Sequence, residues 1–540
     1  MKPHHLGVCA VLLTISFASR AWSEAQRTQE LKGIASNGAA LISSTAARMD
    51  FGSAGLPATA PMNIPSGPGA ATKGVFGPAV NWPVIPIHLT LLPDGRVLSF
   101  GSDQAGLQGA LVHAVWDPSL GTDATAHTVL PNTVSTDIFC AGQTVISSTG
   151  ETLITGGDTT INGIRNYSVA DTTFYDYLTG TMRSGQPMAF KRWYATLVAL
   201  GNGDVAVLGG RSELDTSVYA STPEIYTPGV GFRTLSGAIN EDAYGGNGNY
   251  LWWYPQGFLA PNGKVFIIAH SGQTFWLDPA GNGSIARLNK VTAPVGSFTL
   301  PSLMYAPGKI LSLLEGKKVV AFDLNGPKVK MRAVADRSHE RIFSGTTLLA
   351  DGKVFVNGGS EVYNQLQGVA YHTEIWNPKT GKWRLGASAS KARLYHSNAL
   401  LLPDGTVLTG GGGAPGPVTN LNAEIYYPPY LYKRGTSAAV TSRPNIIKAP
   451  QKIAWNRVFP VTFQSSTKIS RVTFVRSGSS THDLNVDQRF MELKFAKVNK
   501  NTIRVKGPKN RNIAPPGYYM MFLFDRNGVP SVSSMIHLQS

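Results

Sequence analysis

The stretch PDGTVLTGGGG at residues 403–413 decides the fold class of this chain. It begins with a turn signal, Asp404-Gly405, continues into a short apolar strand and ends in a run of glycines. A turn followed by such a strand is typical of antiparallel sheets. Because closely similar phrases recur along the chain, the sequence predicts an array of repeated units.

Seven copies of this phrase follow one another, with their turn glycines 44 to 60 residues apart. Several copies lead into an aromatic strand, such as EIYTP at 224–228 and EIWNP at 374–378. A period of about 50 residues resembles Kelch repeats, each of which forms one four-stranded propeller blade. A β-solenoid would have shorter repeats, so we expect a seven-bladed Kelch-type β-propeller over residues 76–435. The turn glycines are Gly95, Gly150, Gly203, Gly263, Gly308, Gly352 and Gly405.

The repeat stops near residue 440, and a different pattern of short strands follows. Examples are KIAWNRVFPVTFQ at 452–464 and GYYMMFLFDRNG at 517–528. About 100 residues in this pattern predict a C-terminal immunoglobulin-like β-sandwich at 440–540. Charged residues make up only 15% of the chain, which has 58 glycines and 34 prolines, a composition that favours strands and turns. The predicted class is therefore all-β.

The N-terminus has the features of a secretory signal peptide, which we place at residues 1–23. A polar start precedes an apolar run at 6–18, and small residues follow at 21–23. Residues 24–75, rich in Ala, Ser, Gly and Pro, are expected to form a low-complexity linker or arm. The apolar run is too short to span a bilayer easily. We therefore expect no transmembrane anchor, and a monomer that is secreted, periplasmic or on the cell surface.

The chain has a formal net charge of +16. Such a charge can attract an acidic cell wall or polysaccharide, and it can equally serve solubility. Dense basic runs with interleaved aromatic residues are missing from the sequence, so nucleic acid is not an expected partner.

The turn glycines align equivalent positions of the seven copies with one another. We call the count of residues back from each turn glycine the ruler. In each copy, the strand that enters the turn begins about nine or ten residues before the glycine, and equivalent positions in a propeller lie at one height around the axis. Four chemically active residues occupy this height and are expected to converge at one mouth of the channel: Cys140, Tyr194, Tyr395 and His396. Trp253, Tyr254 and Phe343 lie at the same level, with Arg341 just before Phe343.

Two tyrosines, a histidine and a thiol at one height favour a metal site. Phenolates and imidazoles suit Cu(II), which prefers tetragonal coordination by nitrogen and oxygen. A further nitrogen donor is available in the C-terminal part, where His482 lies in a predicted loop within THDLNVDQR. The alternative is that the tyrosines pack against each other with hydrogen-bonded hydroxyls. Both interpretations stay open on spacing alone.

Five segments resemble the galactose oxidase and glyoxal oxidase family of copper-radical oxidases, and they occur in the family's order. The segments are DIFCAG at 137–142, RWYAT at 192–196, LYHSNALLLPDG at 394–405, STHDLNVDQR at 480–489 and PPGYYMMFLFDRNGVPS at 515–531. The resemblance runs from about residue 80 to the C-terminus, and RWYAT is closer to glyoxal oxidases.

The resemblance implies one copper ion held by Tyr194, Tyr395, His396 and His482. It also implies a thioether between Cys140 and Tyr194, which makes Tyr194 the radical site, and it makes Tyr395 the axial ligand and proton acceptor. The implied reaction oxidises small aldehydes, primary alcohols or carbohydrates with dioxygen and releases hydrogen peroxide. We assign a substrate pocket to Trp253, Tyr254, Arg341 and Phe343. The alternative is a non-catalytic Kelch propeller that binds glycans or proteins at the cell surface.

One departure from the family concerns the tryptophan that shields the modified tyrosine in galactose oxidase. The equivalent position here is Ser212, which follows Arg211. Trp193 is a poor replacement because neighbours on a strand point to opposite faces. By the same rule, Tyr395 and His396 can both face a metal only if the strand is irregular or just beginning there.

Overall fold

The computed structural model describes residues 63–539 apart from 215–217, 246–251, 291–298 and 486. The predicted signal peptide and most of the predicted arm lie outside these residues. In the described part, no helix has both the length and the apolar character needed to cross a membrane. The all-β prediction is confirmed, because helices in this part are limited to single turns. They are α2 (Ala70–Lys73), α3 (Glu241–Tyr244) and the 3-10 turns η2 (Pro118–Leu120), η3 (Ala124–Ala126), η4 (Ser236–Ala238) and η5 (Pro429–Leu431).

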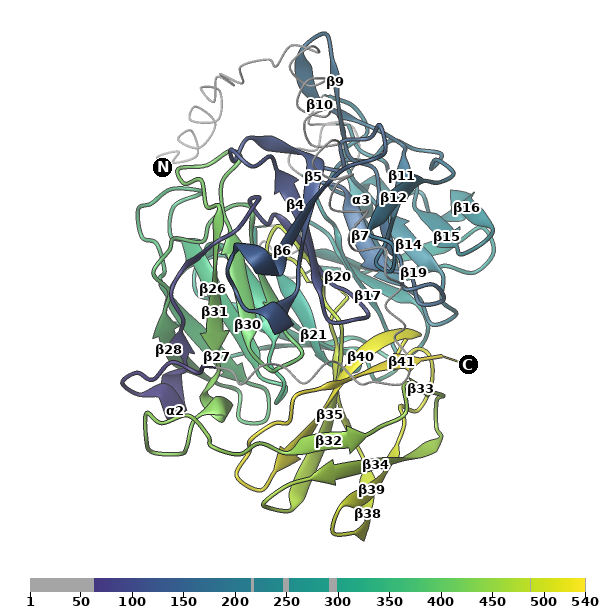
Figure 1. The fold of residues 1–540 in the computed structure, drawn as a ribbon. Helices are drawn as coiled ribbons and strands as arrows, with labels where there is room; N and C mark the ends of the chain where they lie inside the picture. Colours follow the sequence, from purple (N-terminus) through teal and green to yellow (C-terminus); the bar gives the residue numbers. More distant parts are fainter. Residues whose placement is uncertain (1–62, 215–217, 246–251, 291–298, 486, 540) are drawn as a thin grey trace, which may run out of the picture.

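Each copy of the repeat forms the turn between the first two strands of its own antiparallel sheet (Figure 1). The seven turn glycines have φ between 66° and 95°, a left-handed conformation that costs glycine little. This conformation explains why the repeat requires glycine at that position. The first strand is buried along its whole length in several sheets, for example β3, β7, β13 and β17.

The strands group by sheet in chain order. The first sheet has β3 (His88–Leu91), β4 (Val97–Ser102), β5 (Gln108–Trp116) and β6 (His127–Pro131); the second has β7 (Gly142–Val145), β8 (Thr152–Thr155), β11 (Thr172–Asp176) and β12 (Thr181–Ser184), with a separate hairpin of β9 (Asp158–Ile161) and β10 (Ile164–Ser168). The third has β13 (Thr196–Ala199), β14 (Val205–Leu208), β15 (Glu224–Thr227) and β16 (Gly231–Thr234); the fourth has β17 (Gln256–Leu259), β18 (Val265–Ile268), β19 (Gln273–Asp278) and β20 (Ser284–Lys290).

The remaining repeats follow the same order. The fifth sheet has β21 (Ser302–Ala306), β22 (Lys309–Leu313), β23 (Val319–Asp323) and β24 (Lys330–Ala333); the sixth has β25 (Ile342–Leu348), β26 (Val354–Ser360), β27 (His372–Asn377) and β28 (Lys382–Ser388). The last combines β29 (Ser397–Leu401), β30 (Val407–Gly411) and β31 (Asn422–Tyr427) with β1 (Val75–Phe76) and β2 (Val80–Asn81) from the N-terminal side.

First strands of neighbouring sheets contact one another, as in the pairs β7 with β13, β13 with β17, β25 with β29, and β29 with β3. This arrangement is the one expected for the inner strands of a propeller. Closure of the sheets into a ring of seven blades stays a prediction.

The C-terminal part forms two packed sheets around a separate apolar core, which is the layout of a sandwich. One sheet has the order β32 (Asn445–Lys448), β34 (Val458–Gln464), β39 (Thr502–Lys506) and β38 (Phe495–Asn499); the other has β33 (Lys452–Ile453), β41 (Ser534–Leu538), β40 (Gly517–Asp525), β35 (Ile469–Arg476) and β37 (Phe490–Leu493). The short strand β36 (Ser479–Thr481) leaves the sandwich and pairs with β3, with Thr481 opposite His88. This pairing carries the next residue, His482, into the propeller.

Candidate metal centre

The residues that begin the inner strands share an unusual backbone conformation. Five residues at the height predicted by the ruler have positive φ although none is glycine. They are Cys140 (55°), Tyr194 (65°), Tyr254 (46°), Phe343 (61°) and His396 (70°). Non-glycine residues rarely adopt this conformation, and strained positions of this kind gather at functional sites. Because the backbone turns here, the alternation of side chains along a strand does not yet apply, and Tyr395 and His396 can approach the same centre.

Backbone hydrogen bonds join three of these residues across neighbouring sheets. The Tyr194 N–H donates to the Cys140 carbonyl (2.8 Å), and the Tyr254 N–H donates to the Tyr194 carbonyl (2.9 Å). The positions that the ruler aligned in sequence are thus adjacent in space.

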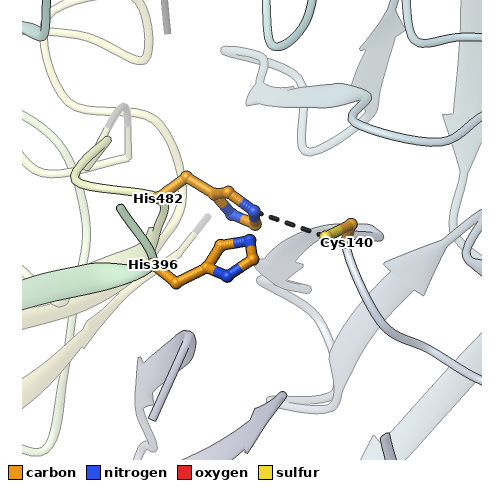
Figure 2. A group of neighbouring side chains, drawn as sticks. All are labelled: Cys140, His396 and His482. Atoms are coloured by element: carbon orange, nitrogen blue, oxygen red, sulfur yellow. Dashed lines mark hydrogen bonds between the residues drawn. The ribbon is translucent and has the colours of Figure 1, made fainter. Parts of the chain in front are cut away.

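Cys140, His396 and His482 form the core of the candidate site (Figure 2). One ligand atom from each lies within 4.8 Å of the other two, and all three side chains are buried. The Cys140 Sγ and His482 Nε2 are 3.3 Å apart. We call these three residues, together with Tyr194 and Tyr395, the central cluster.

The hydrogen bonds of His396 leave its outer nitrogen available to a metal. Its Nδ1 lies 2.6 Å from the Gly413 carbonyl, which can only accept, so the proton is on Nδ1. The buried Nε2 then carries a lone pair and has no hydrogen-bond partner among the described residues. Burial lowers the pKa of His396 to about 3, which keeps the imidazole neutral. A neutral imidazole with one nitrogen oriented by a carbonyl is the usual form of a histidine ligand.

The imidazole of His482 is also oriented by its neighbours and held neutral. Its Nδ1 lies 2.6 Å from the Thr481 hydroxyl, while its Nε2 points toward Cys140. Burial is the largest cause that lowers its pKa well below the ordinary value, and the neighbouring His396 adds to the effect. The donor set of two neutral imidazoles beside two phenols and a thiol therefore fits a copper ion.

The two tyrosines lie directly beside these histidines. The Tyr194 and Tyr395 hydroxyls share a short hydrogen bond. Tyr395 stacks on His396 with ring centroids 3.7 Å apart, and Tyr194 lies 4.8 Å from the His482 ring. Burial, followed by the nearby Cys140 thiol, raises the pKa of Tyr194 well above its ordinary value. Tyr194 is 1% exposed, whereas Tyr395 is partly exposed, so Tyr395 is the tyrosine that a small molecule can reach.

Three of the four predicted pocket residues border the central cluster. Trp253 stacks on Tyr194 with ring centroids 4.3 Å apart and planes 14° apart. Tyr254 meets Tyr194 edge to face at 4.9 Å and donates its hydroxyl proton to the Ala141 carbonyl. Phe343 lies 4.9 Å from the Tyr395 ring.

Arg341, the fourth predicted pocket residue, lies elsewhere. Its side chain is fully buried, pairs with Glu374 at 2.8 Å and donates to the carbonyls of Gly358 and His372. Arg192 with Glu224 and Arg393 with Glu424 repeat this arrangement in two other sheets. Arg341 therefore joins the strands of its own sheet, and its donors are not directed at a substrate.

The spacing of the repeats gives no reason to include His88 in the site, but the structure places it against the central cluster. The Gln143 amide donates to the carbonyls of Leu89 and Ser480, so its oxygen accepts from His88 Nδ1 (3.1 Å). His88 Nε2 is then the acceptor for the Cys140 backbone N–H (3.2 Å). His88 thus fixes the strained backbone of Cys140. The ruler missed it because it lies only seven residues before its turn glycine.

Tyr363 was also missed. It comes from the loop between β26 and β27, outside the repeat, and is 41% exposed. Its ring packs edge to face on Phe343 at 4.8 Å. The aromatic residues Tyr363, Phe343 and Tyr395 therefore run from the surface to the central cluster.

Two parts of the chain match known protein families. Residues 101–303 match the family described as glyoxal oxidase N-terminus, and residues 443–538 match the galactose oxidase-like, early set domain. Galactose oxidase of Gibberella zeae is 27% identical over 514 residues, covering 86% of this chain and 70% of the relative. Aldehyde oxidase GLOX1 of Arabidopsis thaliana is 24% identical, covering 78% and 75%.

A solved structure shares the fold. It is described as a novel fungal alcohol oxidase with catalytic diversity, in complex with copper. It covers 86% of this chain and 100% of its own, with a TM-score of 0.75 and 23% identity. This likeness supports the pairing of a propeller with a sandwich.

Proposed function

Because the chain belongs to the galactose oxidase and glyoxal oxidase family, we propose that it is a secreted copper-radical oxidase that produces hydrogen peroxide. Its substrates are aldehydes or primary alcohols, including alcohols on carbohydrates. The observation that carries the proposal is the convergence of Cys140, His396 and His482 from three distant segments, with a buried nitrogen on His396 that has no partner in the described part of the chain.

We assign the copper ligands to Tyr194, Tyr395, His396 and His482. Cys140 is assigned to a thioether with the Tyr194 ring, because both residues are buried and lie next to each other on neighbouring sheets. The backbone hydrogen bond between the two residues supports this bond as a link between adjacent blades. We further propose domain limits of 76–435 for a seven-bladed propeller and 440–540 for the sandwich that supplies His482.

Bound copper would supply Lewis acidity toward the substrate oxygen and a one-electron redox couple. Tyr395 accepts the hydroxyl proton of a primary alcohol or of an aldehyde hydrate, a role that its partial exposure and its hydrogen bond to Tyr194 support. Oxidised Tyr194 would take one hydrogen atom from the substrate carbon, and the one-electron couple of bound copper would account for the remaining electron. Dioxygen takes up the two electrons and two protons removed from the substrate and leaves as hydrogen peroxide. His396 and His482 hold their imidazoles neutral throughout.

Trp253 supplies the shield that Ser212 lacks. Its ring covers one face of Tyr194 although it comes from the fourth sheet, next to the sheet of Tyr194. Stacking on the indole excludes water from the tyrosine ring, which favours a long-lived radical. Phe343 and Tyr363 then form the apolar wall along which a substrate reaches Tyr395.

The second candidate function is a binding module with a propeller and no chemistry. The buried arginine–glutamate pairs do not distinguish a binding module from an enzyme, because both need a stable scaffold. Copper loading followed by a peroxide assay over small aldehydes, primary alcohols and galactose-containing glycans separates the two. Peroxide formed in step with oxygen consumption supports the oxidase. Copper-loaded protein that forms no peroxide with any of these substrates contradicts it.

A further inference from the structure

The positive charge of this protein is concentrated in its C-terminal part. Residues 441–540 contain 16 Lys and Arg but only four Asp and Glu, a net charge of +12. Residues 63–440 contain 27 basic and 25 acidic residues, a net charge of +2. A solubility requirement alone gives no reason to place the charge on one domain, so we expect a site for an anionic ligand in the sandwich itself.

Most of this charge is exposed and unpaired. Of the four acidic residues, Asp483, Asp487 and Asp525 are buried, and only Glu492 is exposed. Within the described residues, twelve exposed basic side chains of the sandwich form no ion pair. They are Lys448, Lys452, Arg457, Lys468, Lys494, Lys497, Lys500, Arg504, Lys506, Lys509, Arg511 and Arg526.

The strand register places several of these residues on one side of the sheet formed by β32, β34, β39 and β38. Along β39, Ile503 and Val505 are buried while Arg504 and Lys506 are exposed, so both basic residues point outward. Arg504 lies opposite Pro460 on β34, and Lys506 lies opposite Val458. Lys494 is adjacent, because its carbonyl accepts from the Lys506 N–H. We call Lys494, Arg504, Lys506, Lys509 and Arg511 the basic face.

Two surface pockets, of about 580 Å³ and 460 Å³, lie next to this sheet. Asn456 and Lys509 line both, so the pockets adjoin as one cleft. The first pocket is lined by Trp455, Asn456, Lys509, Asn510, Arg511 and Asn512. Lys494 and Lys506 line the second, together with Glu492, whose carboxylate pairs with Arg471 and Lys379.

An aromatic ring inside the first pocket is held in place. Trp455 Nε1 donates to the Ala514 carbonyl (2.8 Å), and the Arg511 guanidinium lies 5.1 Å from the indole centroid. The indole therefore orients a cation at the entrance to the cleft. Three asparagine amides beside it offer both donors and acceptors.

We propose that this cleft and the basic face bind an acidic polysaccharide of the polyuronate type. Lysine and arginine match its carboxylates, asparagine amides match its hydroxyls, and the indole matches the apolar face of a sugar ring. Single-stranded nucleic acid would require a series of aromatic platforms, and the cleft has one. A membrane surface would require an apolar insertion beside the basic residues. The inference goes beyond the proposed oxidation and does not depend on it.

The position of the basic face leaves the oxidation site free. Figure 1 shows β34, β38 and β39 at the lower end of the molecule. The cleft touches the propeller at Pro307, and the basic face shares no residue with the central cluster. A protein held by this face on an anionic matrix would keep its propeller accessible to small substrates.

The test compares two charge reversals of equal size in the full-length, copper-loaded protein. Lys509→Glu with Arg511→Glu changes the basic face, and Lys328→Glu with Lys330→Glu changes exposed lysines of the near-neutral propeller. Binding to soluble polygalacturonate is measured by calorimetry, with dextran as the neutral polymer, at low and high salt. We expect the wild type to bind polygalacturonate and not dextran. The affinity of the wild type should fall as the salt concentration rises. At low salt, the basic-face variant should bind about tenfold or more weakly than the wild type, and the propeller variant less than about threefold more weakly.

Equal losses in both variants would mean that net charge alone drives binding, and would overturn the proposal. So would a wild type that does not bind polygalacturonate at low salt, or that binds duplex DNA or anionic vesicles more tightly through the same residues. Peroxide formation from a small substrate should be the same in both variants. A failure of this proposal is therefore distinguishable from a failure of the proposed oxidase.

A second variant tests the sugar contact. Trp455→Ala should weaken binding to polygalacturonate more than binding to polyphosphate, which has charge but no sugar ring. Trp455→Tyr, which keeps an aromatic face, should restore most of the lost affinity. Equal loss toward both polymers would reduce the site to a general polyanion site and contradict the polysaccharide assignment.

Discussion

Two sets of buried polar residues in the propeller differ in what surrounds them. In the pairs Arg192–Glu224, Arg341–Glu374 and Arg393–Glu424, each arginine faces a carboxylate and backbone carbonyls, although Arg393 Nε has no partner among the described residues. In the central cluster, potential metal-ligand atoms converge from distant segments, and His396 Nε2 has no hydrogen-bond partner among the described residues. Buried polar groups that are satisfied stabilise a fold, whereas convergent groups that lack partners indicate a ligand.

His113 shows that a missing partner alone is not sufficient. It is 1% exposed, neither of its nitrogens has a hydrogen-bond partner in the described part of the chain, and burial lowers its pKa to about 3. Among the described residues it belongs to no group of three potential ligands. Convergence of several donors is therefore the feature that distinguishes the central cluster.

The largest expected effect comes from removing a histidine of the central cluster. His396→Ala should abolish tight copper binding and reduce peroxide formation by at least about a thousandfold, because no other group supplies the missing nitrogen. Copper content and oxygen consumption measure the effect. His113→Ala is the matched control, since it removes an equally buried histidine, and it should lower stability while copper binding persists. Full copper occupancy in His396→Ala would show that the ligand has been misassigned.

The next effect concerns the satisfied pairs. Arg341→Ala leaves Glu374 buried without its partner, which should cost about 3–5 kcal/mol of stability. Arg287→Ala breaks the exposed pair with Asp242 and should cost less than about 1 kcal/mol. Urea unfolding compares the two. Folded Arg341→Ala protein should still bind copper and keep its ranking of substrates, whereas a changed ranking would return Arg341 to the pocket.

A smaller effect is expected at His88. His88→Leu removes the acceptor of the Cys140 N–H, so the thioether should form about tenfold more slowly. His88→Gln places an amide oxygen near the same position and should restore much of the rate. The measurement is the loss of free thiol with time after copper is added. A rate that is unchanged in His88→Leu would show that His88 only packs against the cluster.

Asp158 lies between the paired arginines and the central cluster in character. Its carboxylate has hydrogen-bond partners, but the nearby Arg165 does not offset the effects of burial and Asp137 on its pKa. Burial and the neighbouring Asp137 raise its pKa to about 7, although Arg165 opposes them. Between the ordinary value of 3.8 and about 7, the folded state holds a proton that the unfolded state has released. Stability should therefore fall as pH rises through this window. Urea unfolding should show a weaker decline in Asp158→Asn, and identical pH profiles would contradict the assignment.

The sequence was sufficient to predict the all-β class and the height at which the site lies. Seven turn glycines marked that height because each needs a left-handed backbone, a requirement that only glycine meets at little cost. The ruler could not show that Cys140, Tyr194 and His396 also have positive φ, since nothing in their side chains signals it. It could not separate Arg341 from the pocket either, because the pairing with Glu374 depends on a strand 33 residues away. His88 and Trp253 acquire their contacts only when neighbouring sheets pack together.

If the central cluster is a copper-radical site, Cys140 loses its free thiol when the protein matures with copper. Copper-free protein is exposed to copper and oxygen, denatured under reducing conditions, and then treated with a thiol reagent and weighed by mass spectrometry. We expect no reactive thiol, a loss of two hydrogen atoms in mass, and a crosslinked fragment that joins the peptides of Cys140 and Tyr194. Stoichiometric reaction of Cys140 with the reagent after full copper loading would contradict the account.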